Sequence, residues 1–188
     1  MREPSYTSAQ SLADPRFRGQ WWILGLVLTS MLFNDILGEG LRFDLKTKAS
    51  PEQVLQALTD FTDARLQIWN RTLDPKTYEL RDSGETWAVA PESSRRSPFW
   101  VVVRYDWSDP ESVRWTVLDS SYGGGGEGLV QIAPGDDGGS RVHAEWGYTG
   151  ARGMQRPMIF LIQHGPVRRL IKRMWASALD RYAESSRR

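Results

Sequence analysis

Six short segments of alternating apolar and polar residues, separated by turn residues, fill the chain between residues 76 and 150. This alternation is typical of strands that bury one face. The connections are rich in Asp, Gly, Pro and Ser, which favour tight turns. The segments read KTYELRD, ETWAVAP, PFWVVVRYDW, SVRWTVLD, GLVQIAP and SRVHAEWGYTG. Strands at this regular spacing predict an antiparallel meander with an aromatic-rich inner face and a charged outer face.

One further strand and two short helices are predicted before the meander. LRFDLKTKAS, from Leu41, alternates strictly and predicts a strand. Ser50, Pro51 and Gln53 then form a helix start, with a hydroxyl cap, a proline in the first turn and a capping-box partner. The segment TDFTDARLQIWN predicts a second short helix with Leu66, Ile68 and Trp69 facing inward.

A long amphipathic helix is predicted after the meander. Apolar residues recur at spacings of three and four from Met158 to Tyr182. Gly165–Pro166 must kink this helix or mark its true start, because proline removes a helix hydrogen bond. A helix of this length needs an apolar surface, and the inner face of the sheet is the one available.

The glycine run SYGGGGEGLV contains a G-x-G-x-x-G match at Gly123, Gly125 and Gly128. That motif binds a dinucleotide only where a helix follows the glycines, and here the next segment, LVQIAP, has the character of a strand. The run therefore predicts a connection between two strands.

This order of elements resembles the START-like superfamily, also called SRPBCC or polyketide cyclase/dehydrase and lipid transport. The matching segments are FDLKTKASPEQVLQALTD, SGETWAV, GEGLVQIAPGDDGGSRVHAEW and the closing helix, within about residues 41–184. The resemblance implies an α+β helix-grip fold, in which a curved antiparallel seven-stranded sheet wraps around the long C-terminal helix and two short helices follow strand 1.

The resemblance also implies an apolar cavity between the sheet and the helix. No cofactor is predicted. We expect a small hydrophobic ligand there, such as a lipid, a sterol or a polyketide-like molecule. Two alternatives are a cyclase or dehydratase that uses one acid or base, and a co-chaperone-like interaction module whose core is filled. The predicted ligand-binding residues are Phe43, Tyr78, Trp87, Val101, Tyr105, Trp115, Trp146, Tyr148, Met158 and Met174.

Two residues are candidates for acid–base chemistry. Asp119 falls on the inward register of its strand, and His164 lies where the helix begins to cover the cavity mouth. His143 and Arg104 alternate onto the charged face, so exposed positions are expected for both. The chain has no cysteine and only two histidines, which excludes cysteine-ligated metal sites and leaves no credible metal set.

Charge is unevenly distributed along the chain. The net charge of +1 gives no support for nucleic-acid binding, and none is predicted. Residues 141–188, however, carry 10 basic and 3 acidic side chains. The basic residues Arg168, Arg169, Lys172 and Arg173 can meet an anionic membrane or nucleic acid, but the simpler interpretation is the solvated face of the amphipathic helix.

The first 40 residues lie outside the resemblance. Residues 1–20 are polar and predict disorder, and 185–188 form a short tail. Trp21 to Phe33 is apolar for 13 residues, which is short for a bilayer span of about 20 residues. A packed helix, an interfacial anchor, a signal peptide, or an artefact of a start really at Met31 all fit residues 21–40. The expected location is the cytoplasm, with membrane contact through residues 21–37.

Overall fold

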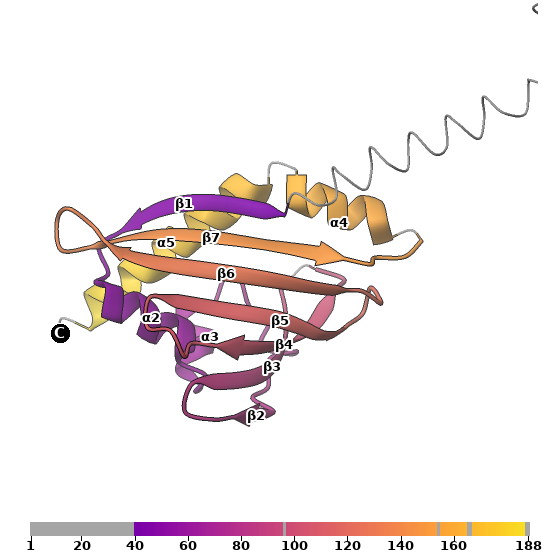
Figure 1. Ribbon diagram of the computed structural model, residues 1–188, viewed down its shortest axis with the longest axis horizontal. Coiled ribbons are helices and arrows are strands. Elements are labelled where there is room, and N and C mark those ends of the chain that lie inside the picture. The colour runs from indigo at the N-terminus through magenta and orange to yellow at the C-terminus, as the bar shows by residue number, and fades with distance from the viewer. Residues whose placement is uncertain (1–39, 96, 154, 165–166, 187–188) are drawn as a thin grey trace, which may run out of the picture. The chain divides into compact units, whose positions relative to one another are not determined.

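The computed structural model describes residues 40–95, 97–153, 155–164 and 167–186. These residues form one antiparallel sheet with helices on one face (Figure 1). The predictions for residues 1–39 lie outside the described residues. Among the residues that are described, no helix is long and apolar enough to cross a membrane.

The sheet contains seven strands, in the order β1-β7-β6-β5-β4-β3-β2, and every neighbouring pair is antiparallel. The strands are β1 (Leu41–Thr47), β2 (Asp82–Ser83), β3 (Trp87–Ser93), β4 (Trp100–Asp106), β5 (Ser112–Ser120), β6 (Gly125–Pro134) and β7 (Ser140–Thr149). The predicted first strand and the antiparallel order of the meander are therefore confirmed. The pairing of β1 with β7 brings the start of the domain beside its last strand.

Two short helices follow β1, as predicted: α2 (Pro51–Thr59) and α3 (Ala64–Ile68). The predicted capping box is present, because the Ser50 hydroxyl accepts from the Gln53 backbone N–H and the Gln53 side chain accepts from the Ser50 N–H. Ile68 and Trp69 are buried and Leu66 is partly buried against the core. This confirms the inward face of the second helix.

The C-terminal helical pattern forms two helices, α4 (Gln155–His164) and α5 (Val167–Ser185), which meet on either side of Gly165–Pro166. The glycine and proline themselves lie outside the described residues. Helix α5 runs behind the sheet in Figure 1 and packs on β1, α2 and α3. Its residues Ala178, Leu179 and Ala183 are buried in the main core.

The segment from Lys76 to Asp82 was predicted as a full strand, and this prediction is wrong. Only Asp82–Ser83 forms a strand beside β3, next to one hydrogen bond from the Arg81 N–H to the Val89 carbonyl. The Asp74 carbonyl accepts hydrogen bonds from the N–H groups of Thr77 and Tyr78, so the chain turns here. The Tyr78 hydroxyl donates to the carbonyl of Phe61 at 2.7 Å, which holds the turn against the helices.

The glycine run connects β5 to β6, as predicted, and is closely packed. Gly123 takes the left-handed φ of 69° that closes the turn. Gly124 approaches the backbone of Thr149 so closely that a side chain would overlap it. Its N–H donates to the Ser120 hydroxyl, which in turn donates to the Gly124 carbonyl at 2.6 Å. Hydrogen bonds and close backbone contacts thus hold this strand connection in place.

Asp180 fastens α5 to the end of β1. Its carboxylate accepts hydrogen bonds from the Thr47 hydroxyl at 2.7 Å and from the Lys48 N–H at 2.8 Å. Asp180→Ala should lower the free energy of unfolding by about 2 kcal/mol, because both donors lose a charged acceptor. Urea unfolding followed by circular dichroism measures this loss.

Glu184→Ala, one helical turn further on, is the matched control. Glu184 meets Lys48 at 3.5 Å, with both side chains well exposed. Its removal should change the free energy of unfolding by less than about 1 kcal/mol. Equal losses for the two variants would show that the Asp180 hydrogen bonds do not fasten the helix.

Candidate ligand-binding cavity

A cavity of about 160 Å³ lies between the inner face of the sheet, α3 and α5. Its wall is mostly aromatic and aliphatic, with a few polar side chains. It is lined by Leu58, Arg65, Trp69, Thr72, Leu73, Glu92, Ser94, Val101, Val103, Tyr105, Val113, Trp115, Val117, Trp146, Tyr148 and Trp175. The cavity thus has the composition of a small-molecule site, in which a few polar groups are set in an apolar wall.

A buried polar group stands at this cavity and is formed by Arg65, Glu92 and Tyr105. Arg65 donates through Nε and a terminal nitrogen to Glu92 Oε1, at 3.0 and 2.8 Å. The Tyr105 hydroxyl donates to Glu92 Oε2 at 2.7 Å. Arg65 and Glu92 are only 5% and 9% exposed. Glu92 therefore places a carboxylate, neutralised by a guanidinium, beside an aromatic space.

The helices and strands fix each member of this group. The other terminal nitrogen of Arg65 donates to the Leu58 carbonyl at 2.9 Å, and its guanidinium lies 4.2 Å from the ring centre of Phe61. Glu92 follows Ala88 and Ala90 on the inner face of β3. Tyr105 comes from β4, beside β3, and packs near Trp115 of β5. Three elements therefore converge on one carboxylate.

Burial and charge shift the pKa values of these groups. Burial alone lowers the pKa of Arg65, but the charge and hydrogen bond of Glu92, together with Tyr105 and Tyr78, outweigh burial and the pKa is raised overall. Burial raises the pKa of Tyr105 well above 10, and the negative charge of Glu92 adds to this. Burial likewise raises the pKa of Tyr148. Near neutral pH the guanidinium is charged and both phenols are neutral hydrogen-bonding groups.

Five of the predicted ligand-binding residues line the cavity: Val101, Tyr105, Trp115, Trp146 and Tyr148. Phe43 lies behind the wall, with its ring edge-to-face on Trp146 and Trp175. The Tyr78 hydroxyl instead donates to the Phe61 carbonyl, and burial raises the pKa of Tyr78 to about 12. Met158 is 42% exposed on α4, and Met174 is partly buried and does not line the cavity.

The predicted inward position of Trp87 is wrong, because the register of β3 is shifted by one residue. Ala88 and Ala90 face the core, so Trp87 and Val89 face the other side. The Trp87 ring lies against Gly84 and under the guanidinium of Arg104, at 5.2 Å. Arg104 is exposed, as predicted.

The predicted inward position of Asp119 is also wrong, because β5 contains a bulge. Val103 pairs with Val117 while Val102 pairs with Asp119, so Leu118 is left without a partner on β4. An extra residue in one strand turns the side chain of the following residue to the opposite face of the sheet. Asp119 is therefore exposed and accepts only a local hydrogen bond, from the Ser120 N–H.

The two histidines are placed differently. His164 ends α4, and its side chain lies outside the described residues. His143 lies on the outer face, as predicted, with Nδ1 2.7 Å from an Asp44 carboxylate oxygen. No group of three or more potential metal-ligating side chains occurs among the described residues.

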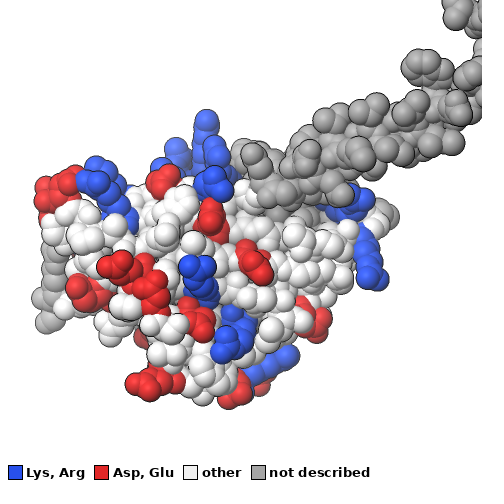
Figure 2. All heavy atoms as spheres, in the orientation of Figure 1, with Lys and Arg blue, Asp and Glu red and all other residues white. Residues whose placement is uncertain are grey.

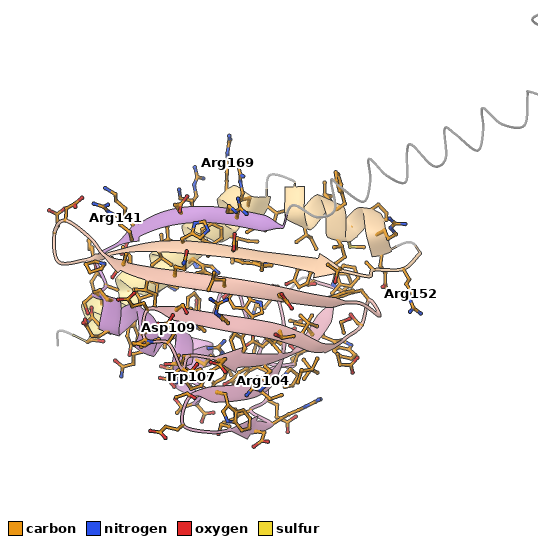
Figure 3. The ribbon with its side chains drawn as sticks, viewed as in Figure 1. Arg104, Trp107, Asp109, Arg141, Arg152 and Arg169 are labelled. Carbon is orange, nitrogen blue, oxygen red and sulfur yellow. The ribbon has the colours of Figure 1, made fainter. Side chains whose placement is uncertain are left out.

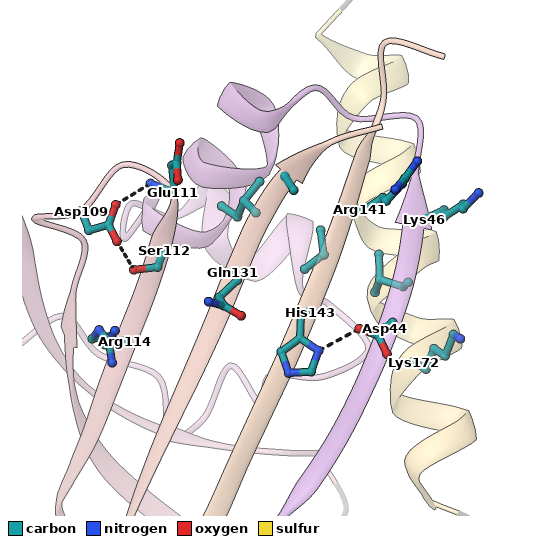
Figure 4. Close-up of a pocket in the computed structure, with 14 residues that line it drawn as sticks. Asp44, Lys46, Asp109, Glu111, Ser112, Arg114, Gln131, Arg141, His143 and Lys172 are labelled. Carbon is teal, nitrogen blue, oxygen red and sulfur yellow. Dashed lines mark hydrogen bonds and ion pairs between the residues drawn. The ribbon is translucent and has the colours of Figure 1, made fainter. Parts of the chain in front are cut away.

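A larger hollow of about 770 Å³ lies on the outer face of the sheet (Figure 4). Its polar groups bond to one another: Asp109 accepts from the Glu111 N–H and the Ser112 hydroxyl, and His143 meets Asp44. Acidic and basic side chains also alternate over this face (Figure 2). The inner cavity is the better candidate because its polar groups are buried and converge on one point.

Gly128 shapes the cavity wall, because it leaves room for the indole of Trp115. It pairs with Trp115 on one side and Trp146 on the other, and a methyl group at position 128 would overlap the Trp115 ring. Gly128→Ala should therefore displace Trp115 and lower the free energy of unfolding by about 1–3 kcal/mol. Denaturant unfolding measures this loss, and tryptophan fluorescence reports the displacement.

Gly125→Ala is the control, since Gly125 lies in the same strand and a Cβ there would meet only the Thr149 hydroxyl, at an ordinary contact distance of 3.9 Å. It should leave the fluorescence spectrum unchanged. If Gly128→Ala left both stability and spectrum at wild-type values, the close fit of Trp115 on Gly128 would be refuted.

The sheet, the two helices after β1 and the long C-terminal helix define the START-like helix-grip fold. Residues 45–186 match the sequence profile described as Polyketide cyclase / dehydrase and lipid transport. The chain belongs to this family, whose fold and cavity are those of a hydrophobic ligand-binding domain.

Solved structures share the fold at low sequence identity. The protein TTHA0849 from Thermus thermophilus is 14% identical, with a TM-score of 0.60, over 78% of this chain and 97% of that one. A START superfamily protein from Mycobacterium smegmatis is 13% identical, with a TM-score of 0.57, over 77% and 97%. Norcoclaurine synthase from Thalictrum flavum is 12% identical, with a TM-score of 0.56, over 77% and 86%. No curated protein matches the sequence significantly.

Proposed function

We propose that this protein binds a small aromatic molecule, of about one ring with a polar substituent, in the inner cavity. One observation carries the proposal: the Arg65–Glu92–Tyr105 group stands in an aromatic-walled cavity of about 160 Å³. An apolar cavity of about 150 Å³ is large enough for benzene. Drug-sized ligands need about 300–1,000 Å³, so a sterol or a long lipid is disfavoured.

A neighbour in fold supports this size class. The structure of norcoclaurine synthase from Thalictrum flavum holds dopamine and hydroxybenzaldehyde, which are both single-ring molecules. The interaction-module alternative is not proposed, because it required a filled core.

Phenol and toluene are suitable probes because they have nearly the same size and differ by one hydroxyl group. We expect both to bind, and phenol to bind more tightly by about tenfold, since its hydroxyl gains a partner at Glu92 or Tyr105. Calorimetric titration measures both affinities, after mass spectrometry of the protein under native conditions has identified any molecule that copurifies. Absence of binding by both probes would refute the proposal.

Tyr105→Phe keeps the ring and removes the hydroxyl that meets Glu92, so it should change the preference for phenol over toluene. Tyr122→Phe is the matched control, because Tyr122 is a buried tyrosine of the same sheet region whose hydroxyl donates to the Gly125 carbonyl. That variant should leave the preference unchanged.

A cyclase or dehydratase activity is the second candidate, and Glu92 favours it. A buried carboxylate beside a bound aromatic molecule can accept a proton from it. Glu92 thus replaces Asp119 as the candidate acid–base residue, and a role of His164 in acid–base chemistry stays a prediction. Hydrogen–deuterium exchange into the copurified molecule, catalysed by wild type and lost in Glu92→Gln, would support catalysis; exchange at the uncatalysed rate would refute it.

A further inference from the structure

The residues from Trp146 to Leu179 contain six basic side chains and no acidic one. The basic residues are Arg152, Arg156, Arg168, Arg169, Lys172 and Arg173. All six are exposed, and no ion pair between described residues includes any of them. Figure 3 shows Arg152 and Arg169 pointing away from the sheet. The positive charge of this region is therefore not neutralised within the described domain.

Large apolar side chains are exposed among these charges. Met158 and Leu161 are 42% and 58% exposed on α4, one helical turn apart, while Ile159 holds the opposite side of that helix in the core. Leu170, also 58% exposed, lies between the arginines and Lys172 of α5. We call the exposed side chains of α4 and of the first two turns of α5 the basic apolar surface. It combines the two features by which peripheral helices bind lipid.

The start of the domain lies beside this surface. Helix α4 contacts β1, and Figure 1 shows it next to the end of β1 at which the strand begins. Seven residues separate the apolar run Trp21–Phe33 from Leu41 in the sequence.

We propose that the basic apolar surface docks on an anionic membrane. Anionic lipid headgroups complement the five positive charges of this surface, from Arg156, Arg168, Arg169, Lys172 and Arg173, and the acyl boundary accepts Met158, Leu161 and Leu170. A second copy of this chain is disfavoured because it would oppose positive charge with positive charge. A nucleic acid would meet the arginines but would leave the apolar side chains in water. This docking is independent of the proposed ligand.

Sedimentation of the full chain with lipid vesicles tests the docking. We expect binding to vesicles of phosphatidylcholine with phosphatidylglycerol to be at least about tenfold stronger than to phosphatidylcholine alone, and to weaken with added salt. Arg168→Glu with Arg169→Glu should remove most of the difference. Arg81→Glu with Arg114→Glu changes the charge equally on exposed sites of the sheet region and should have little effect.

The apolar contribution has its own pair of variants. Leu161→Asn should weaken binding to the anionic vesicles, whereas Leu118→Asn, at the similarly exposed (56%) bulge of β5, should not. Equal binding to neutral and anionic vesicles would assign attachment to the apolar run and overturn the proposal. Absence of vesicle binding, binding to a DNA duplex instead, or a lipid-free dimer abolished by Leu161→Asn would also overturn it.

Discussion

Glu92→Ala is expected to lower the free energy of unfolding by about 3–5 kcal/mol, the largest single effect of an ion-pair change in this protein. The substitution leaves the buried guanidinium of Arg65 without its carboxylate and removes the acceptor of the Tyr105 hydroxyl. Urea unfolding measures the loss. Glu145→Ala is the control, because its partner Arg42 lies at the similar distance of 3.0 Å but is 70% exposed. That loss should be less than about 1 kcal/mol.

The double variant Arg65→Met with Glu92→Leu tests whether the two residues stabilise the fold as a coupled pair. It removes both charges, so its loss should be well below the sum of the losses for Arg65→Met and Glu92→Leu. A remainder is expected because the Leu58 carbonyl and the Tyr105 hydroxyl lose partners. Additive losses, or equal losses for Glu92→Ala and Glu145→Ala, would contradict a coupled buried pair.

An apolar pair of similar volume can fill such a position with little loss of stability. Stability alone therefore does not account for a carboxylate and a guanidinium in an aromatic cavity. Recognition of a polar substituent on the proposed ligand would account for them. This links the stability measurement to the phenol and toluene titrations.

The fold could be predicted because its signals are long and periodic. Alternation over β1 and β7, the capping box at Ser50 and the apolar spacing of α5 each specify an element locally. The main error, the strand at 76–82, arose because Tyr78 and Leu80 alternate correctly. The Asp74 turn and the hydrogen bond from Tyr78 to Phe61 depend on tertiary contacts that the segment itself does not encode.

Glu92 could not be placed because β3 is apolar on both faces. In ETWAVAPES, either Trp87 and Val89 or Ala88 and Ala90 can face inward, and the choice reverses the position of Glu92. The larger size of Trp87 and Val89 favours these two as the core residues. The structure uses the alanines, which pack with Phe61. Nothing in the segment itself distinguishes these two registers.

The burial of Arg65 could have been predicted from its position in the sequence. It lies four residues after Phe61 and four before Trp69, so all three share one face of the helical segment. An arginine between two inward aromatic residues indicates a buried partner. The exposed position of Asp119 could not be predicted in this way, because the bulge at Leu118 arises from pairing with β4.

Trp146→Ala is the second large effect, because Trp146 lies at the centre of the aromatic cluster. Its ring stacks on that of Trp175, with 5.8 Å between the ring centres. The ring centres of Phe43 and Trp115 lie 5.7 and 5.9 Å from that of Trp146. Removing it should lower the free energy of unfolding by about 3–5 kcal/mol and enlarge the cavity by the volume of an indole. Thermal unfolding measures the loss. Trp100→Ala is the control, because Trp100 is 39% exposed and should be much less costly to remove.

Indole tests whether the enlarged cavity stays open. A ligand that binds only the folded state raises its stability, so added indole should raise the melting temperature of Trp146→Ala and leave that of Trp100→Ala unchanged. Trp146→Ala should then also prefer naphthalene-sized probes to phenol, because the ring that limits the cavity to one aromatic unit is gone. Absence of both effects would mean that the neighbouring tryptophans collapse into the space, and that Trp146 does not set the size of the ligand.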